Sequence, residues 1–314
     1  DKVLVARSED NGQTWTDVVQ FDDVVDPVLT LAPDGTVILA LQRGTFAGTN
    51  LELHRSLDNG NTWEYYSALP SSGFADKPYL AFDSEGRLYC TYIIFDFGFN
   101  IVEVARSDDN GQTWNAPTTF LDPVNIYLTG SFVAVGNDDV VYVSWGESAS
   151  GKVFFTKSDD FGDSWSEPLE IATYPVVDYS PMTYIINNKI SDFIGIITTI
   201  AHSNTEMLLS YSYDAGATWT SKLLDSTATN PSALVQANGS VHIAYNHFPG
   251  NYDDGFYSEM RYITSTDSCV TFSEPLVLEE GEADYLYSTY IGEYQAMSVG
   301  LDSELHVTWV RKTL

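Results

Sequence analysis

An octapeptide that recurs along the whole chain constrains the fold more than any other sequence feature. It reads SEDNGQTW at 8–15, SLDNGNTW at 56–63, SDDNGQTW at 107–114, SDDFGDSW at 158–165 and SYDAGATW at 212–219. A sixth, degenerate copy, STDSCVTF at 265–272, has Cys269 in place of the glycine. A period of about 50 residues, filled with short Val-, Ile- and Tyr-rich segments, is typical of a radial array of small antiparallel sheets. The six copies predict six such sheets, or blades.

Each octapeptide has the composition of a tight turn. Its third residue, an Asp, can accept hydrogen bonds across the turn, its Gly can adopt a positive φ, and its Ser hydroxyl can support the Asp. The closing Trp would then pack inward. We interpret the six aspartates as structural residues of the turn between the third and fourth strands of each blade, and not as catalytic groups: Asp10, Asp58, Asp109, Asp160, Asp214 and Asp267.

The pattern S-x-D-x-G-x-T/S-W resembles the Asp-box, or BNR, repeat of the sialidase superfamily, and the resemblance covers nearly the whole chain. It implies an all-β fold, a six-bladed β-propeller of four-stranded antiparallel blades. Between successive octapeptides the chain supplies one outer strand and then three further strands, as in DKPYLAFD, RLYCTYII and IVEVARS before the third copy. The resemblance also implies a secreted or cell-surface protein.

The two ends of the chain carry complementary halves of one blade. Residues 291–314 supply only first and second strands, and residues 1–22 supply only third and fourth strands. Pairing these halves would close the ring and remove the exposed strand edges of an open ring. We therefore predict a single domain, 1–314, in which residues 1–22 and 291–314 complete one shared blade.

Composition excludes several classes of function. The chain has 14 Lys and Arg against 44 Asp and Glu, a formal charge of −30, which repels nucleic-acid phosphates and anionic lipid surfaces. No apolar run approaches the roughly 20 residues needed to cross a bilayer. Cys90 and Cys269 lack metal-ligand spacing, so we interpret them as free packing residues in preference to a disulfide or zinc site.

Antiparallel connectivity places a functional site on the face opposite the Asp-boxes. The loops that lead into the first strand of each blade emerge there, near the central channel. These loops carry carboxylates and an amide, which we expect to form a ring: Asp26, Asp76, Asp178, Asn230 and Glu293. The alternative is that these side chains only cap exposed loop N–H groups.

The loops between second and third strands add further groups to the same face, namely Arg43, Asp96, Trp145, Glu147, His202 and His247. Flat rings beside carboxylates and amides suit sugar recognition, whereas packing of the aromatic rings between neighbouring loops is the alternative. The segment NYDDGFY is similar to a calcium loop, with Asp253 and Asp254 as ligands. Nothing else in the sequence requires a cofactor.

The sialidase resemblance implies an arginine cluster for a substrate carboxylate, a Tyr nucleophile activated by a Glu, and an Asp acid–base. Glu293 and Tyr294 stand at the position of the Glu–Tyr pair. However, Val25 stands where the first arginine is expected, and the loop after Arg43 contains no Asp. A reduced cluster of Arg43, Arg261 and Arg311 remains open, since their blades are neighbours in a closed ring.

A glycosidase of another type would use two carboxylates, with Glu147, Asp178 and Glu293 as catalytic candidates beside Asp26, Asp76 and Asp96. Their separation, roughly 5 Å for retention or 6.5–9.5 Å for inversion, would set the stereochemistry. We therefore predict a monomeric propeller that binds a glycan or glycoconjugate and has no nucleic-acid or membrane contacts. As a glycosidase it would also hydrolyse this glycan. The alternative is a non-catalytic adhesion or protein-interaction module.

Overall fold

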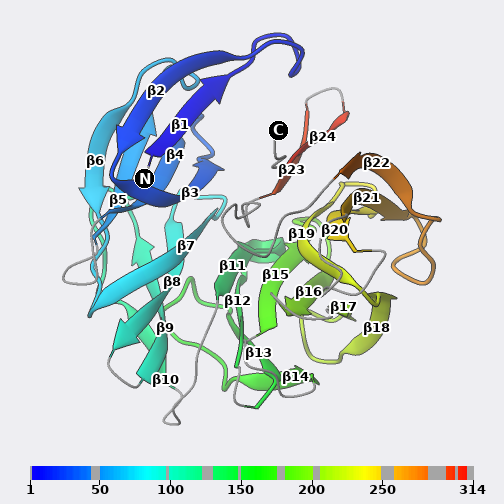
Figure 1. The fold of residues 1–314 in the computed structure, drawn as a ribbon. Helices are drawn as coiled ribbons and strands as arrows, with labels where there is room; N and C mark the ends of the chain where they lie inside the picture. Colours follow the sequence, from blue (N-terminus) through cyan, green and yellow to red (C-terminus); the bar gives the residue numbers. More distant parts are fainter. Residues whose placement is uncertain are drawn as a thin grey trace.

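The computed structural model describes residues 2–43, 50–96, 99–121, 130–147, 150–174, 181–200, 206–248, 258–281, 295–300 and 303–309. This part of the chain is almost entirely β-structure, and most of its strands form five four-stranded antiparallel sheets. The sheets are arranged radially around a common centre, as the blades of a β-propeller (Figure 1). Among the described residues no helix is long and apolar enough to cross a membrane.

Each blade takes its four strands consecutively from the chain, from the innermost strand outward. The first blade contains β3 (Val24–Leu31), β4 (Val37–Arg43), β5 (Asn50–Ser56) and β6 (Glu64–Ala68); the second contains β7 (Phe74–Phe82), β8 (Leu88–Asp96), β9 (Phe99–Ser107) and β10 (Thr118–Leu121). The third contains β11 (Ser131–Val135), β12 (Val141–Gly146), β13 (Lys152–Ser158) and β14 (Leu169–Thr173). The fourth contains β15 (Pro181–Asn187), β16 (Ile194–Ile200), β17 (Met207–Ser212) and β18 (Thr220–Asp225); the fifth contains β19 (Ala228–Val235), β20 (Val241–His247), β21 (Ser258–Ser265) and β22 (Leu276–Gly281).

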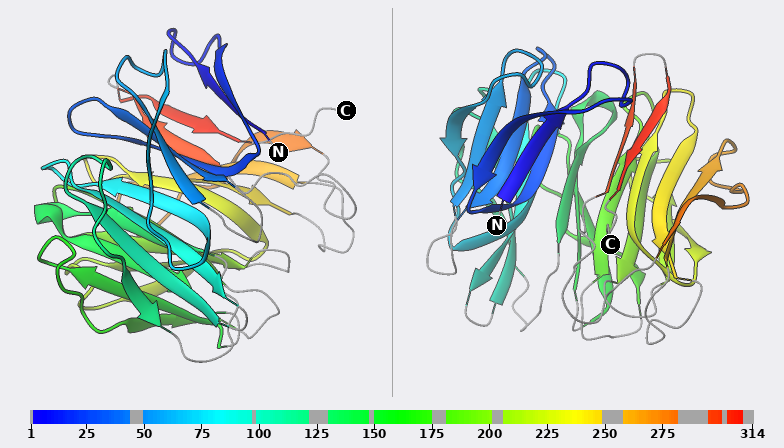
Figure 2. Two further views of the ribbon diagram at one scale, coloured as in Figure 1. Left: turned by 90° about the vertical axis from the view of Figure 1, so that its left-hand side faces the viewer. Right: turned by 45° about the horizontal axis from the view of Figure 1, so that its top comes forward.

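The prediction of six four-stranded blades is wrong, because the residues that the structure describes form five. Of the expected sixth blade, β1 (Lys2–Arg7) pairs with β2 (Thr16–Asp22), and β23 (Ala296–Val299) pairs with β24 (Leu305–Thr308), in two separate two-stranded sheets. Figure 2 shows both hairpins between the first and fifth blades. The strands β23 and β24 have only four residues each, so they offer few backbone groups for pairing with β1. The described residues of the two hairpins form no ladder with each other.

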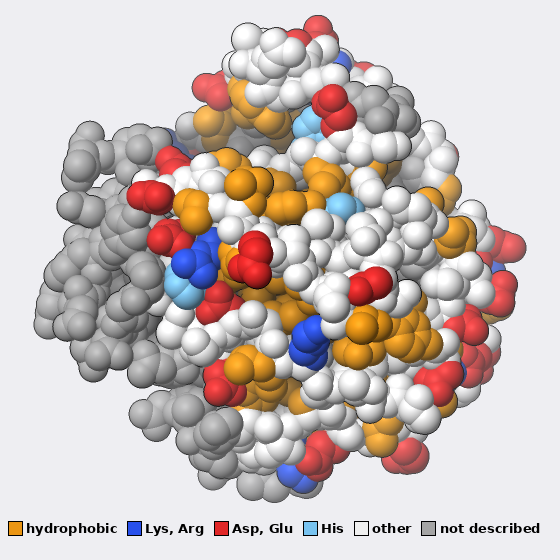
Figure 3. Space-filling view, turned by 90° about the vertical axis from the view of Figure 1, so that its right-hand side faces the viewer, with side chains coloured by type: hydrophobic (Ala, Val, Ile, Leu, Met, Phe, Trp, Pro, Cys, Tyr) orange, Lys and Arg blue, Asp and Glu red, His pale blue; other side chains and the backbone are white. Residues whose placement is uncertain are grey.

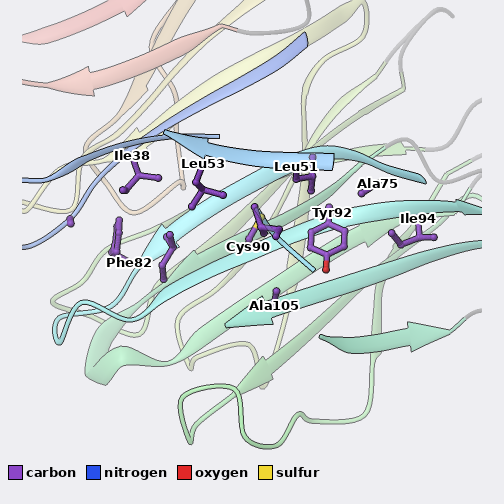
Figure 4. Close-up of a cluster of buried hydrophobic side chains, with 12 residues drawn as sticks. Ile38, Leu51, Leu53, Ala75, Phe82, Cys90, Tyr92, Ile94 and Ala105 are labelled. Carbon is purple, nitrogen blue, oxygen red and sulfur yellow. The ribbon is translucent and has the colours of Figure 1, made fainter. Parts of the chain in front are cut away.

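The hydrophobic core lies between neighbouring blades and not in one central mass. Leu51 and Leu53 of the first blade pack against Cys90 and Tyr92 of the second (Figure 4). Similar clusters lie between the second and third, third and fourth, and fourth and fifth blades. Cys90 and Cys269 are both free and buried, as their spacing predicts.

All six octapeptides form the same hydrogen-bonded turn. In the third copy the Ser107 hydroxyl donates to Asp109 Oδ1 (2.8 Å), the Gly111 N–H donates to Ser107 Oγ (2.7 Å), and Thr113 donates its N–H and hydroxyl to Asp109 at 2.7 and 2.6 Å. The degenerate copy keeps this pattern, because Cys269 adopts a positive φ of 64° where the other copies have Gly. The hydrogen bonds hold a carboxyl pKa at about 2 in four copies, at Asp10, Asp160, Asp214 and Asp267.

The closing aromatic residue of five octapeptides packs against a core cluster: Trp63, Trp114, Trp165, Trp219 and Phe272. Trp15 is different, since 58% of its surface is exposed. It belongs to the β1–β2 hairpin, which lacks the two further strands of a complete blade. Trp114, by contrast, packs against Leu51 and Leu53 of the preceding blade.

Candidate functional site

Three inner strands carry the same irregularity near their first residues. In β3, Val25 pairs with Gln42 but Val28 pairs with Ala40, so one extra residue is inserted. Strands β7 and β19 contain the same one-residue bulge, between Asp76 and Tyr79 and between Thr229 and Ser232. A β-bulge of this kind redirects side chains and is common beside active sites.

In each bulge the residue before a proline adopts a left-handed conformation. Its φ is 50° at Asp26, 51° at Lys77 and 50° at Asn230. Non-glycine residues in this region carry a cost of order 1–3 kcal/mol and persist only where the surrounding structure imposes them. The three bulges lie where inner strands begin, at the opposite end from the Asp-box turns. We call this side of the propeller the loop face.

The bulges bring two predicted site residues together, because the Asp26 and Asp76 side chains are hydrogen-bonded to each other. Burial raises the pKa of Asp76 to about 7, and the hydrogen bond and negative charge of Asp26 act in the same direction. The charge of Lys77 and its N–H, which donates to Asp76 Oδ1 at 3.0 Å, oppose this rise. A neighbouring negative charge disfavours ionisation, so the closeness of Asp26 favours the protonated form of Asp76.

Asp26 and Asp76 reach each other from different positions in their bulges. Asp26 is the left-handed residue of its bulge, whereas Asp76 precedes the left-handed residue Lys77. An alignment that matches Asp26 with Asp76 misses this offset, because the residue equivalent to Asp26 in the β7 bulge is Lys77. The sequence does contain a feature common to the three bulges, a residue followed by proline, in the dipeptides DP, KP and NP. In the third bulge Asn230 is buried, and its Oδ1 accepts a hydrogen bond from the Thr229 hydroxyl (3.2 Å).

His247 lies at the end of β20, in a charged network that joins the fourth and fifth blades. Its Nδ1 is 2.9 Å from Asp225 Oδ2, which also accepts a hydrogen bond from the Tyr245 hydroxyl (3.2 Å). Arg261 lies 3.7 Å from the same oxygen and is paired at 2.6 Å with Glu259. Burial alone would raise the pKa of Asp225, but the hydrogen bonds, chiefly with His247, hold it below its usual value.

Arg43 is also paired with a carboxylate. Its Nε lies 2.8 Å from Glu52 Oε1, and its Nη1 donates to the Asp22 carbonyl at 3.0 Å. His54 Nε2 approaches the other Glu52 oxygen at 3.4 Å. Of the three arginines of the expected cluster, the two that the structure describes are therefore engaged by carboxylates of the chain itself.

Trp145 lies near the end of β12, the second strand of the third blade, and Glu147 directly follows this strand. Trp145 stacks on Phe120 and Phe154, with ring centroids 5.5 and 5.7 Å apart, and only 6% of its surface is exposed. It therefore packs in the core between the second and third blades. Glu147 is buried, and its Oε2 accepts a hydrogen bond from the Ser150 hydroxyl (2.7 Å).

Among the buried carboxylates that sequence reasoning missed, Glu103 of β9 contacts the chain that leads into the site. Its side chain accepts hydrogen bonds from the Ser72 hydroxyl at 2.6 Å and the Ser72 N–H at 3.5 Å. Ser72 belongs to the connection that leads into β7 and Asp76. The signal was a single acidic residue between Val102 and Val104 in an otherwise apolar strand.

The remaining predicted site residues lie outside the described residues: Asp178, His202, Asp253, Asp254, Glu293, Tyr294 and Arg311. The backbone of Asp96 ends β8, but its side chain is also outside this set. Within the parts that the structure describes, no group of three or more His, Cys, Asp or Glu residues is arranged to hold a metal ion. Figure 3 shows one side of the molecule, where acidic side chains are spread widely and basic ones are few.

The radial blades and the hydrogen-bonded octapeptides define an Asp-box β-propeller. Residues 77–299 match the family model described as BNR repeat-like domain. The chain therefore belongs to the BNR repeat-like family, as the octapeptides predict.

Comparison with known proteins also returns carbohydrate-active enzymes. A xyloglucanase from Paenibacillus sp is 27% identical over 189 residues, which are 54% of this chain and 18% of that enzyme. A Hadza microbial sialidase superposes with a TM-score of 0.60 at 16% identity, covering 92% of this chain and 63% of that one. The GH93 α-L-arabinofuranosidase of Fusarium graminearum, solved with arabinobiose, gives 0.57 at 13% identity, covering 90% and 86%. At these identities the two structural matches show the fold alone.

Proposed function

We propose that the loop face binds a neutral glycan and that the chain hydrolyses a glycosidic bond there, with Asp76 as the proton donor. The observation that carries this proposal is the Asp26–Asp76 pair, in which Asp76 has a pKa of about 7. A general acid works best when its pKa lies near the operating pH, because it is then both protonated and able to give up its proton. The names of the similar xyloglucanase and arabinofuranosidase support a glycan substrate.

The pair acts as one acid and not as the two separate carboxyls of a glycosidase. Two carboxyls within hydrogen-bonding distance are closer than the roughly 5 Å of retaining enzymes and leave no room for the scissile bond between them. Asp76 would protonate the leaving oxygen, and Asp26 would keep the proton in place beforehand. The second carboxylate comes from elsewhere on the loop face, with Glu147, Asp178 and Glu293 as candidates.

A neutral sugar fits the electrostatics better than sialic acid. Arg43 and Arg261 are engaged by Glu52 and Glu259, so binding a substrate carboxylate there would require breaking ion pairs. The net charge of −30 also repels an anionic ligand. These observations argue against the sialidase reaction that the Asp-box resemblance implies.

The test is a screen of the purified protein against fluorogenic arabinofuranosides, xyloglucan oligosaccharide glycosides and a sialoside, with glycan-array binding measured on the same sample. We expect turnover of a neutral glycoside and a fall in kcat above about pH 7, where Asp76 loses its proton. Asp76→Asn should lower kcat by roughly 10²–10⁴-fold while glycan binding persists. Asp17→Asn, at an exposed position of β2, is the matched control.

The outcomes separate the two classes of function. Glycan binding without turnover would replace the hydrolase by a carbohydrate-binding adhesion module. Neither binding nor turnover would favour a protein-interaction module. Turnover that Asp76→Asn leaves intact would place the acid elsewhere, and Glu293→Gln and Asp178→Asn would then be the next variants.

We further propose that residues 1–314 act as one domain, as a monomer outside the cell. The continuous series of blades from β3 to β22 supports the single domain. Limited proteolysis and size-exclusion chromatography test it, since a stable fragment shorter than the series of blades, or a dimer, would contradict the proposal.

A further inference from the structure

The inner strands surround a cavity of about 520 Å³. Residues of β1, β3, β4, β7, β11, β15, β19 and β23 line it, so all five blades contribute and it lies near the axis of the propeller. This volume is within the roughly 300–1,000 Å³ that small-molecule sites occupy. Neither Asp26 nor Asp76 lines the cavity, so the cavity is separate from the proposed catalytic pair.

The cavity wall is apolar and partly aromatic. Val28, Leu39 and Ile185 supply aliphatic surface, and three rings from successive blades follow one another along the wall. The ring centroids of Tyr79 and Phe132 lie 4.4 Å apart, and those of Phe132 and Tyr184 lie 5.9 Å apart. Such a wall favours a ligand group that gains free energy by leaving water.

Hydrogen-bonding groups are few on this wall. Among the residues that the structure describes, the polar side chains on the wall are those of Tyr79, Tyr184, Ser232 and Gln295. The buried Oε1 of Gln295 accepts no hydrogen bond from any residue that the structure describes. A sugar ring placed here would lose the hydration of several hydroxyls without replacement, at a cost of about 1–3 kcal/mol each. A hydrocarbon or aryl group with at most one donor for Gln295 fits the wall better.

The cavity and the carboxyl pair adjoin each other along two strands. Asp26 directly precedes Pro27, and Asp76 lies three residues before Tyr79; Pro27 and Tyr79 both line the cavity. An amphiphilic molecule whose polar end lies at the carboxyl pair therefore has its apolar end at the cavity. From this juxtaposition we infer that the central cavity binds the apolar aglycone of an alkyl or aryl glycoside, an inference that rests on the proposed function for the position of the sugar.

The direct test uses Nile red, a neutral hydrophobic dye, and the whole chain. We expect saturable binding that n-octyl β-glucoside displaces below its micelle concentration and methyl β-glucoside does not. Val28→Trp should fill the cavity and weaken dye binding by about tenfold or more, a loss of about 1.4 kcal/mol. Val277→Trp, on the partly exposed outer strand β22, is the matched control and should bind dye like the parent chain.

Folding of each variant is checked by near-UV circular dichroism, and Ala233→Leu, a smaller intrusion into the same cavity, replaces Val28→Trp if that chain does not fold. Equal dye binding by the cavity variants and Val277→Trp, or displacement by both glucosides alike, would overturn the inference. Asp76→Asn separates it from the proposed function, because this variant should keep dye binding and lose turnover. Dye binding in a chain that hydrolyses no glycoside would leave the cavity site standing and remove the hydrolase.

Discussion

At the scale of single residues, burial of Asp76 beside Asp26 keeps a proton bound near neutral pH and lowers the stability of the folded chain. The folded chain keeps the Asp76 proton up to about pH 7, because burial raises the pKa of this carboxyl. The unfolded chain releases the same proton near the ordinary value of 3.8. Between these two pH values the folded state binds more protons than the unfolded state, so the free energy of unfolding falls as pH rises.

Asp76→Asn should therefore stabilise the protein, by roughly 2–4 kcal/mol at pH 8. The asparagine amide needs no proton to remain neutral and can still donate to Asp26. The gain should shrink steadily below pH 7 and vanish near pH 4, where Asp76 is protonated in both states. Urea unfolding of the variant, the parent chain and Asp17→Asn at pH 4, 6 and 8 measures it; a gain independent of pH would mean that Asp76 does not hold this proton.

At the scale of elements, the connection before β7 is fastened by the strands beside it. Glu103 of β9 accepts two hydrogen bonds from Ser72, and the Tyr92 hydroxyl of β8 donates to the Pro70 carbonyl at 2.5 Å. Glu103 and Tyr92 are buried, so these hydrogen bonds satisfy polar atoms that have little access to water. The path of the chain into Asp76 therefore depends on a residue that does not lie at the site.

Glu103→Ala should lower the free energy of unfolding by about 0.5–1.5 kcal/mol, because it removes the hydrogen bonds from Ser72. Glu103→Gln keeps a carbonyl oxygen for the Ser72 hydroxyl and should recover most of the loss. Thermal unfolding of both variants, with Glu274→Ala at an exposed position as the control, measures the difference. Equal losses in the Ala and Gln variants would show that the hydrogen bond to Ser72 contributes little.

These elements also show which features a sequence can predict. The bonds of an Asp-box join residues at most four positions apart, as from Thr113 to Asp109, so one octapeptide contains the whole turn. The Asp26–Asp76 pair depends on two bulges and on a contact between blades, neither of which a local pattern records. The prediction of a sixth blade was wrong for a related reason. Strand-like segments at both chain ends do not specify whether β24 pairs with β1.

At the scale of the whole molecule, the dominant feature is an excess of negative charge. The 44 acidic side chains face only 14 Lys and Arg. Most ion pairs among the described residues join partly exposed groups, such as Arg106 with Asp163 and Lys152 with Glu170. Exposed pairs of this kind contribute at most about 1 kcal/mol each. Repulsion among the unpaired carboxylates is therefore a long-range cost that grows as the folded chain brings them together.

Added salt should raise the melting temperature, because it screens this repulsion. The Debye length falls from about 10 Å at 0.1 M to about 3 Å at 1 M ionic strength, so we expect a rise of several degrees between low salt and 1 M NaCl at pH 7, measured by calorimetry. The control is the same titration near pH 4.1, the isoelectric point, where the net charge and hence the rise should nearly vanish. A melting temperature that stays constant with NaCl at pH 7, or rises equally at both pH values, would show that self-repulsion does not limit the stability of this propeller.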